Sequence, residues 1–261
     1  MKRVIGWIIN HIPRPLMQRV AGWMVPIIGL LYLGKGKECP ICKARRRKFI
    51  PYGYTTQREN ALCPNCLSLE RHRLMWLYIT RESNLLAELP SLIHIAPEVS
   101  ISKRLQKAYK SASKAADYVT ADLESPLATM HFDVQQIPLA DNSFEVVICN
   151  HLLEHVNSDI AAMAELYRIM KPNGWGILLS PVEYDRATTY EDDTITDPNE
   201  RTRIFGQYDH RRIYGRDYAE RLRSVGFSVE EIDYNQELTP EEVNLYALTR
   251  EIIYVVRKIT Q

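Results

Sequence analysis

The chain has 261 residues, of which 46% are hydrophobic and 25% are charged, and its formal net charge is +1. This length can bury a sizeable core in one large domain with a smaller appendage, and the composition is ordinary for a soluble globular protein. Because nucleic-acid-binding proteins usually present a clearly basic face, the balanced charge argues against a nucleic-acid partner unless a local patch supplies one.

An apolar arm, residues 1–36, opens the chain. Fifteen uncharged residues lie between Arg19 and Lys35, and Pro26 interrupts them. This run is shorter than the ~20 residues of a transmembrane helix, and no small-residue cleavage site indicates a signal peptide. Basic flanks and tryptophans favour an arm in the membrane interface, which predicts a cytoplasmic protein that is peripheral on the inner face of the membrane. The alternative is a helical pair that packs on the main domain or on the second subunit of a homodimer.

Four of the five cysteines form two CxxC pairs, Cys39 with Cys42 and Cys63 with Cys66. Two thiolates three positions apart can face one ion, and two such turns supply the four soft ligands of tetrahedral zinc. The alternatives are two disulfides or four unrelated thiols. We predict a zinc-ribbon-like module over residues 37–66 with a structural Zn²⁺, because four protein ligands leave no open position for catalysis. The pattern also favours a reducing, cytosolic compartment.

Strand and helix signals alternate through residues 67–261. A helix over 68–82, with Ser68 as its N-cap, leads into this region. Short apolar runs predict strands at 91–95, 117–121, 130–134, 144–149, 175–180, 226–234 and 250–258. Apolar residues at helical spacing predict helices at 100–110, 158–170 and 215–225. The alternation predicts an α/β fold with a doubly wound, mostly parallel, seven-stranded sheet and helices on both faces.

Acidic residues follow the second and third strands of this sheet. Ligands of doubly wound sheets bind beyond the carboxyl ends of the strands. Asp122 is therefore placed to accept hydrogen bonds from both hydroxyls of a ribose, although a loop or N-cap aspartate would look the same. Asp133 is placed to accept from the exocyclic amine of an adenine, with Val134 beside the base, and the alternative is a turn aspartate.

Residues 132–181 carry several motifs at fixed spacings. These are Ile137-Pro138, Asp141, Ser143-Phe144, Leu153-Glu154-His155 and the stretch from Arg168 to Gly174. The series closely resembles the class I S-adenosylmethionine-dependent methyltransferases. The resemblance implies a Rossmann-like methyltransferase fold, S-adenosyl-L-methionine as the cofactor and methyl transfer as the reaction. The cysteine pairs, the SLERHR helix and the IAPE stretch look like a bacterial subgroup of these enzymes.

Two features depart from the pattern of that family. The glycine-rich loop after the first strand is replaced by residues 94–98, which contain no glycine, and the short link between Asp122 and Asp133 must be a loop. Since the cofactor has no phosphate, it needs no anion cradle, and the rigid Pro97 can keep the backbone close to it. Glu98 either accepts from the cofactor's amino group or is a first-turn helix glutamate. The predicted cofactor-binding residues are His94, Ala96, Pro97, Glu98, Asp122, Asp133, Val134, Asn150 and His151.

The acceptor side is predicted to lie near the fourth strand. Methyl transfer from a sulfonium is a direct displacement, and a general base is needed only if the acceptor keeps a proton. His151 and His155 are the candidates for that base. Residues 181–215 lack clear periodicity and predict a lid, in which Asp209 is placed to orient His210. The predicted acceptor contacts are Tyr190, Tyr208, Arg211 and Tyr214.

Three functions are compatible with these features. The first is a methyltransferase for a small-molecule or lipid-linked acceptor close to the membrane. The second is an RNA methyltransferase whose zinc module grips the substrate; the KARRRK stretch at residues 43–48 supports it and the near-neutral charge opposes it. The third is a non-catalytic scaffold with the methyltransferase fold, suggested by the lost glycines and opposed by Asp122, Asp133 and the histidine-rich lid.

Overall fold

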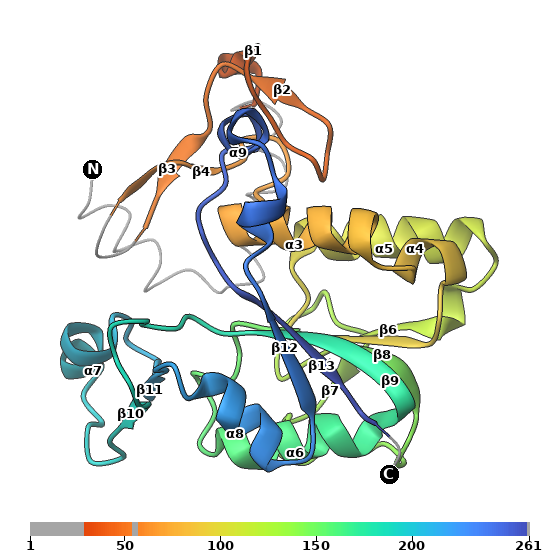
Figure 1. The fold of residues 1–261 in the computed structure, drawn as a ribbon, viewed down its shortest axis with the longest axis vertical. Helices are drawn as coiled ribbons and strands as arrows, with labels where there is room; N and C mark the ends of the chain where they lie inside the picture. Colours follow the sequence, from red (N-terminus) through yellow and green to blue (C-terminus); the bar gives the residue numbers. More distant parts are fainter. Residues whose placement is uncertain (1–28, 54–56, 260–261) are drawn as a thin grey trace.

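The computed structural model describes residues 29–53 and 57–259, and a seven-stranded sheet lies at the centre of this part of the chain (Figure 1). Its strands are β5 (Leu92–Ile95), β6 (Tyr118–Asp122), β7 (Met130–His131), β8 (Phe144–Asn150), β9 (Met170–Leu179), β12 (Ser228–Ile232) and β13 (Ile253–Arg257). Their order is β12-β13-β9-β8-β5-β6-β7, and β13 is antiparallel to both of its neighbours while the pairs among β5 to β9 are parallel. The predicted fold class is confirmed. The strand order reverses between β5 and β8, where such sheets bind ligands.

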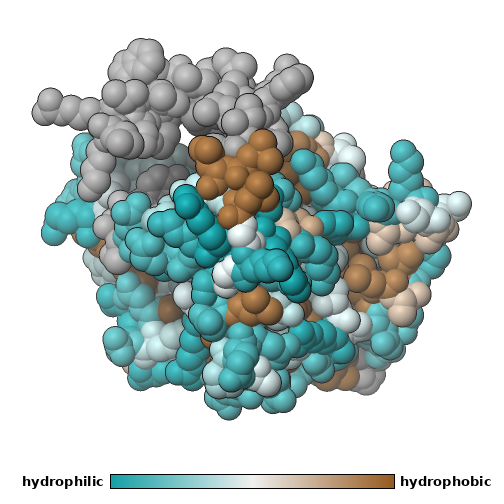
Figure 2. Space-filling model, turned by 90° about the horizontal axis from the view of Figure 1, so that it is seen from above, coloured by the Kyte–Doolittle hydropathy of each residue, from teal (hydrophilic) through white to brown (hydrophobic). Residues whose placement is uncertain are grey.

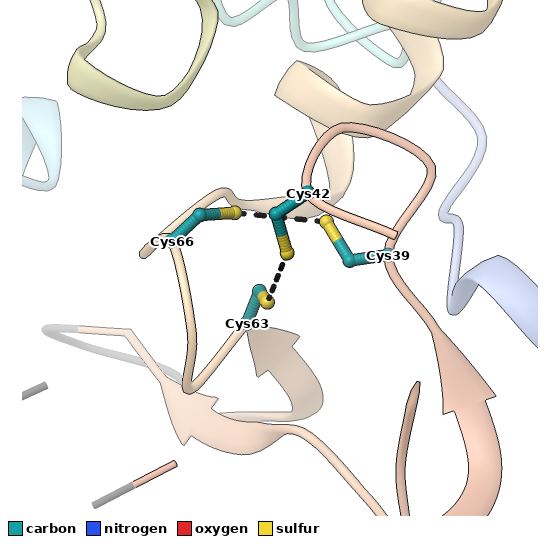
Figure 3. A group of neighbouring side chains, drawn as sticks. All are labelled: Cys39, Cys42, Cys63 and Cys66. Carbon is teal, nitrogen blue, oxygen red and sulfur yellow. Dashed lines mark hydrogen bonds between the residues drawn. The ribbon is translucent and has the colours of Figure 1, made fainter. Parts of the chain in front are cut away.

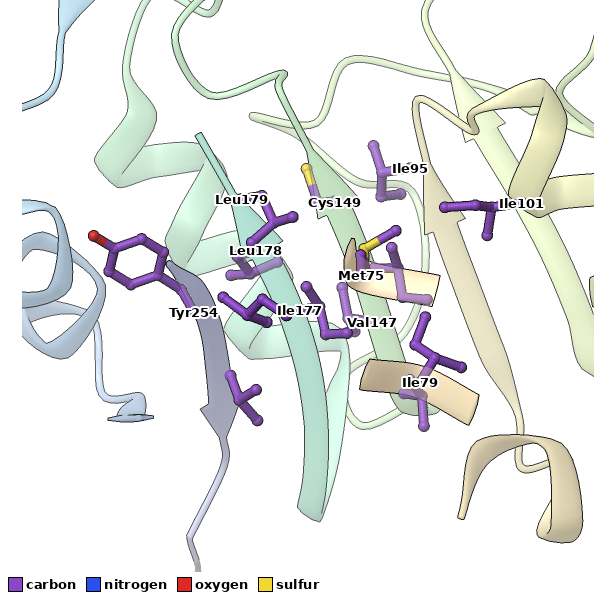
Figure 4. Close-up of a cluster of buried hydrophobic side chains, with 14 of the residues drawn as sticks. Met75, Ile79, Ile95, Ile101, Val147, Cys149, Ile177, Leu178, Leu179 and Tyr254 are labelled. Atoms are coloured by element: carbon purple, nitrogen blue, oxygen red, sulfur yellow. The ribbon is translucent and has the colours of Figure 1, made fainter. Parts of the chain in front are cut away.

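Helices cover both faces of the sheet (Figure 1). On one side lie α3 (Glu70–Glu82), α4 (Leu85–Glu88) and α5 (Val99–Ser111), and on the other α6 (Asp159–Ile169) and α8 (Tyr218–Ser224). Met75 and Ile79 of α3 lie next to Val147 of β8 in the core, and all three side chains are buried (Figure 4). Because burying one such side chain stabilises the fold by about 1.5–3 kcal/mol, α3 is fixed firmly on the sheet.

The cysteine pairs belong to a small module of two antiparallel ribbons. β1 (Leu33–Glu38) pairs with β2 (Arg45–Arg46), and β3 (Ile50–Tyr52) pairs with β4 (Arg58–Leu62). β1 crosses the predicted boundary at residue 36, so the described end of the predicted arm forms part of this ribbon. Most of that arm, residues 1–28, lies outside the described residues, and its interfacial role stays a prediction. Within the described ranges, no helix combines the length and the apolar character that crossing a bilayer requires.

The predicted lid, residues 181–215, contains regular structure that the sequence analysis missed. β10 (Tyr190–Glu191) and β11 (Arg212–Ile213) form a two-stranded ribbon, and α7 (Pro198–Phe205) lies between them in the chain. Asp197 caps α7 by accepting hydrogen bonds from the first backbone N–H groups, and Gly206 ends the helix with φ at +83°. A further missed helix, α9 (Pro240–Tyr246), packs against the cysteine module (Figure 1).

Several predicted boundaries also change. The helix that leads into the main domain begins at Glu70 with Leu69 as its N-cap, because the hydroxyl of Ser68 faces cysteine sulfurs instead. β9 begins directly after α6 and takes in the Pro-Asn-Gly segment that was expected to end the helix. β7 keeps only two residues of the predicted strand 130–134. As the short spacing predicted, no helix lies between β6 and β7, all of whose linking residues are described.

One buried arginine joins three distant parts of the chain. All five N–H groups of the Arg73 guanidinium, on α3, donate hydrogen bonds of 2.6–3.3 Å to backbone carbonyls. These carbonyls belong to Asn60, Ala61, Ser68, Tyr246 and Ala247. Arg73 is 0% exposed. Because only a guanidinium offers five donors in a fixed fork, no other side chain satisfies this set of carbonyls.

Replacing Arg73 with lysine should destabilise the fold by about 2–4 kcal/mol, because three donors cannot satisfy five buried carbonyls. Urea unfolding followed by circular dichroism measures the change. Arg203→Lys is the matched control, since that side chain is 74% exposed on α7, and it should shift stability by less than about 0.5 kcal/mol. Equal stability of Arg73→Lys and the parent would contradict the role assigned to this arginine.

Candidate active site

The loop after β5 takes the backbone conformation that glycine usually supplies. Ala96 has φ at +49°, in the left-handed region, and its N–H donates to the carbonyl of Ala121 at 2.8 Å. This conformation costs a non-glycine residue about 1–2 kcal/mol, and the hydrogen bond to β6 helps to hold it. We expected the rigid Pro97 to compensate for the missing glycine. In the structure, Ala96 takes the left-handed conformation in place of a glycine, and Pro97 is buried.

Glu98 provides a fixed negative charge where β5 and β8 end. Its Oε2 lies 2.7 Å from Nε2 of His94, and its Oε1 accepts a 3.0 Å hydrogen bond from the Asn150 amide. His94 is fully buried, and its Nδ1 contacts the hydroxyl of Tyr118 at 3.0 Å. Burial alone would raise the pKa of Glu98, but the hydrogen bond and charge of His94 hold it well below its usual range. The Glu98 side chain does not cap α5. These contacts therefore favour a role in binding a positively charged group over that of a first-turn helix glutamate.

Asp122 and Asp133 both shape their own turns. Oδ1 of Asp122 accepts from the backbone N–H groups of residues 124 and 125 at 2.9 and 2.8 Å, and no hydrogen bond joins Oδ2 to any described residue. Asp133 accepts from the backbone N–H of Gln135 at 2.8 Å and from its side-chain amide. Val134 beside it is 4% exposed. The turn interpretation therefore applies to both aspartates, and Asp122 keeps one oxygen for a ligand.

These strand ends fit the cofactor that the resemblance implies. S-adenosylmethionine carries two ribose hydroxyls, an ammonium group and a sulfonium, so it needs acceptors and negative charge. Asp122 offers a carboxylate oxygen, and Glu98 adds a second, ionised carboxylate. Asn150, the last residue of β8, donates to Glu98, and the next residue, His151, lies on the wall of a cavity. The cofactor edge and the cavity therefore meet at the end of one strand.

The cavity has a volume of about 570 Å³ and lies beyond the ends of β8 and β9. Its wall is built from the β3–β4 ribbon, the start of α3, the turns after β8 and β9, the lid, and the segment before β13. Side chains from sequence positions as far apart as Tyr52 and Glu251 meet there. A volume of this size can hold a small molecule or the reactive end of a larger one.

His151 is the most constrained residue of this wall. Its φ is +51°, and its N–H donates to the carbonyl of Leu179 at 2.7 Å. Nδ1 lies 3.6 Å from Glu154 and Nε2 lies 3.6 Å from Glu251, yet the buried Nε2 has no hydrogen-bond partner among the described residues. Burial alone would raise the pKa of Glu154, but His151 and His155 lower it to about 2, whereas burial raises the pKa of Glu251. Backbone strain and a ring nitrogen without a hydrogen-bond partner among the described residues make His151 a candidate for contact with a ligand.

Asp209 lies against a different histidine from the one that the sequence predicted. Its Oδ2 is 3.5 Å from Nδ1 of His155, whereas Nδ1 of His210 lies 3.2 Å from the carbonyl of Phe205. The rings of His155 and His210 pack edge to face with their centroids 4.7 Å apart, and both line the cavity. Burial lowers the pKa of His210. Asp209 therefore pairs with His155, and its predicted role in orienting His210 stays a prediction.

None of the four predicted acceptor contacts lines this cavity. Tyr214 is fully buried, and its hydroxyl donates to Asp159 at 2.9 Å, so it stabilises the fold. Tyr190 and Tyr208 are exposed, at 37% and 44%. Arg211 donates its backbone N–H to the turn after β8. This arrangement gives no support to the prediction that these four residues contact the acceptor.

Arg212, the neighbour of a predicted residue, ties the lid to the turn after β8. Its guanidinium donates to the carbonyls of Leu153, Val156 and Asn157 at 2.6–2.9 Å and pairs with Glu191 of β10 at 2.9 Å. Arg71 and Glu251 also line the cavity and were missed. Arg71 lies in the SLERHR stretch and Glu251 just before β13, and no local sequence pattern brings these positions to the wall.

The four sulfurs of the cysteine module face one another (Figure 3). Sγ of Cys39 lies 3.6 Å from that of Cys66, and Sγ of Cys42 lies 3.8 Å from that of Cys63. All four fall within 4.8 Å of one another, and none forms a disulfide. Zinc–sulfur bonds of about 2.3 Å in a tetrahedral site put the sulfurs about 3.8 Å apart, so this donor set fits Zn²⁺.

The two CxxC turns have the same backbone geometry. The carbonyl of Cys39 accepts from Lys43 at 2.8 Å, and the carbonyl of Cys63 accepts from Leu67 at 2.9 Å. Lys43 and Leu67 both have positive φ, at +60° and +59°. Oγ of Ser68 lies 3.3 Å from the sulfurs of both Cys39 and Cys66. Matching turns aim both cysteine pairs at one point, which is what a shared ion requires.

Residues 84–178 match a family model described as a methyltransferase domain. A stretch of 42 residues is 43% identical to the ubiquinone/menaquinone biosynthesis C-methyltransferase UbiE of Desulfotalea psychrophila, and it covers 16% of this chain and 17% of that protein. Among solved structures, the YcgJ protein of Bacillus subtilis is 13% identical, with 73% of this chain and 100% of that chain covered and a TM-score of 0.45. An S-adenosylmethionine-dependent methyltransferase of Mesorhizobium loti is 11% identical, with 70% and 97% covered and a TM-score of 0.42.

Removing one cysteine ligand should open the zinc site that the sequence predicts. In Cys42→Ser, the remaining three thiols of the module should react with a thiol reagent at rates at least about 10-fold higher than in the parent, because a bound ion protects thiolates and its loss frees them. A chelator should have the same effect on the parent. Cys149→Ser is the matched control, since Cys149 is buried in the sheet and outside the cluster. Unchanged reactivity in Cys42→Ser would contradict zinc binding.

Proposed function

We propose that this chain, whose residues 84–178 form a class I S-adenosylmethionine-dependent methyltransferase domain, transfers a methyl group to an acceptor bound in the 570 Å³ cavity. The observation that carries the proposal is the position of that cavity. It begins at His151, directly after Asn150, which contacts the cofactor edge through Glu98. Donor and acceptor would therefore meet at the end of β8, as a direct displacement requires.

The cofactor side of the proposal rests on the strand ends of β5, β6 and β8. Oδ2 of Asp122 would accept from the ribose hydroxyls, and charge-assisted hydrogen bonds of this kind are stronger than neutral ones. Glu98, held by His94 and Asn150, would face the cationic groups. When bound, S-adenosylmethionine supplies a methyl group on a sulfonium. Binding of this cofactor is supported by the family of the domain and by this charge pattern.

On the acceptor side, His151 is the proposed general base. Its Nε2 is buried at the cavity wall without a hydrogen-bond partner among the described residues. Nδ1 lies 3.6 Å from Oε1 of Glu154, so Nε2 is the ring nitrogen left to take a proton. The side chain is thus placed to accept the proton of an acceptor group that stays protonated at neutral pH.

The polar wall favours a small polar acceptor or the polar end of a lipid-linked one. Arg58, Arg71 and Arg212 line the cavity together with Glu70 and Glu251. A lipid-linked acceptor would place this end of the molecule near a membrane. The surface seen from above is mostly hydrophilic with separate apolar patches (Figure 2). Leu30, Leu31 and Leu33, in the last part of the predicted arm, are 59–69% exposed, which supports a membrane-proximal site.

The RNA alternative receives less support from the same structure. Within the KARRRK stretch, Arg45 pairs with Glu38 at 2.8 Å, and Arg46 donates to Asn65 at 3.0 Å. Both side chains therefore already have partners on the module surface. Nucleic acid thus remains the less favoured acceptor, and the acceptor fractions described below include it.

Calorimetric titration of S-adenosylmethionine into the full chain tests the proposal. The parent should bind one cofactor, and Asp122→Ala should bind about 10–100-fold more weakly, because it loses charge-assisted hydrogen bonds of about 1.5–3 kcal/mol. Asp117→Ala is the matched control: Asp117 precedes β6 and Asp122 ends it, so the two lie at opposite ends of one strand. Absence of binding by the parent would defeat the proposal.

Transfer of a labelled methyl group to lipid, small-molecule and RNA fractions then identifies the acceptor class. Label in the RNA fraction alone would replace the proposed acceptor by the alternative. Label in none of the fractions, despite cofactor binding, would favour the non-catalytic scaffold.

His151→Gln should lower kcat by about 100-fold or more with the labelled acceptor, because a positioned general base contributes 10²–10⁴-fold. Cofactor affinity should stay within about twofold of the parent. His131→Gln, at an exposed position on β7, is the matched control and should keep the parent rate. A His151→Gln variant with unchanged kcat would show that the acceptor needs no base or that another residue supplies it.

A further inference from the structure

Three side chains with metal-binding donors meet inside the cavity. Glu154 and His155 come from the turn after β8, and His210 comes from the lid. One donor atom from each lies within 4.8 Å of the other two. Oε1 of Glu154 and Nε2 of His155 are 4.0 Å apart, and the two imidazole rings pack at 4.7 Å between centroids. The carboxylate and the His155 nitrogen are therefore too far apart to hydrogen bond and leave a space between them.

The outer contacts of the cluster are those that metal ligands commonly make. Nδ1 of His155 faces Oδ2 of Asp209 at 3.5 Å, and Asp209 accepts from the Gln207 amide at 2.7 Å. Nδ1 of His210 faces the carbonyl of Phe205 at 3.2 Å. Oε2 of Glu154 accepts from the Ser180 hydroxyl at 3.2 Å. Metal-bound histidines usually donate their other ring N–H to a carboxylate or a carbonyl, and both kinds of partner occur here.

These contacts fix which nitrogen of each ring is available. When Nδ1–H donates to Asp209 or to the Phe205 carbonyl, Nε2 carries the lone pair that binds a metal. Glu154 is 2% exposed. Two imidazole nitrogens and one carboxylate suit Zn²⁺, Mn²⁺, Fe²⁺ or Co²⁺. With bonds of about 2.1 Å, neighbouring donors come to about 3–3.4 Å, so these side chains need to move by less than about 1 Å.

We infer that Glu154, His155 and His210 bind one divalent transition-metal ion whose remaining coordination positions face the acceptor cavity. This site differs from the cysteine cluster, where four protein ligands complete a tetrahedron. Three protein ligands leave room for an oxygen of a bound molecule. The site also gives a role to the turn after β8 and to the histidine of the lid, which come together only in the folded chain.

A role for the ion in catalysis rests on the function proposed above. A hydroxyl of the acceptor that binds the ion loses its proton more easily, because the positive charge stabilises the alkoxide. Nε2 of His151, whose Nδ1 lies 3.6 Å from Glu154, takes that proton. The oxygen then forms its bond to the methyl carbon while the carbon–sulfur bond breaks and its electron pair stays on sulfur. The inferred acceptor class is therefore a molecule with a hydroxyl group.

Cobalt titration of the full-length protein, with zinc kept on the cysteine pairs and no S-adenosylmethionine added, tests the metal site. The parent should bind one Co²⁺ with the weak visible bands of nitrogen and oxygen ligands and without thiolate charge-transfer bands. His210→Ala should bind at least about 100-fold more weakly. Asp209→Asn, which alters the partner of His155, should bind about 10–100-fold more weakly. His131→Ala is the matched control and should bind like the parent, since His131 is exposed on β7.

The outcomes separate the two proposals. Circular dichroism first establishes that each variant is folded. A parent that takes up cobalt only with thiolate bands, or a folded His210→Ala that binds cobalt like the parent, overturns the metal site. Either result leaves cofactor binding untouched. Conversely, a parent that binds cobalt at this site but no S-adenosylmethionine keeps the metal site and defeats the methyltransferase proposal.

Discussion

The hydrogen bonds of Arg73 are the constraint on which the cavity depends. One cation satisfies carbonyls of β4, of Ser68 ahead of α3, and of the end of α9. These segments can therefore reach their positions only together. The same helix then presents Arg71 to the cavity and Met75 to Asn150. Arg73 thus helps to fix the cysteine module, which supplies Tyr52 and Arg58 to the wall, on α3, as does the 2.9 Å ion pair of Arg58 with Glu70.

The parallel sheet explains why the residues proposed to bind the cofactor and the acceptor lie at one edge of the sheet. Parallel strands end at a common edge, so Asp122 and Asn150 lie at the same edge on either side of β5, although long segments separate them in the chain. At the end of β8 the left-handed conformation of His151 turns the chain sharply. Asn150 consequently faces the cofactor edge while the next residue faces the cavity. The proposed cofactor side and the proposed acceptor side are therefore adjacent, at Asn150 and His151.

Sequence patterns predicted the sheet and the cysteine cluster well, because both depend on local spacing. Buried strands such as β8 are continuous apolar runs, and two CxxC turns are specific for one ion. The helix α7 was missed although its Asp197-Pro198 start and Gly206 end are ordinary capping signals, because Phe205 is its one buried residue and no apolar stripe marks it. The cavity wall could not be predicted in the same way. Arg71 and Glu251 reach it through packing between distant elements, which no local period records.

The contacts of Arg212 decide which part of the lid is able to move. Its guanidinium binds three carbonyls of the turn after β8 and a carboxylate of β10, so the carboxyl-terminal part of the lid cannot swing away without stranding several buried polar groups. The side chains of α7, in the middle of the lid, are instead mostly exposed. The wall of the pocket is therefore held more firmly at β11 than at α7. Any opening of the proposed acceptor pocket would then come from the motion of one short helix rather than of the whole lid.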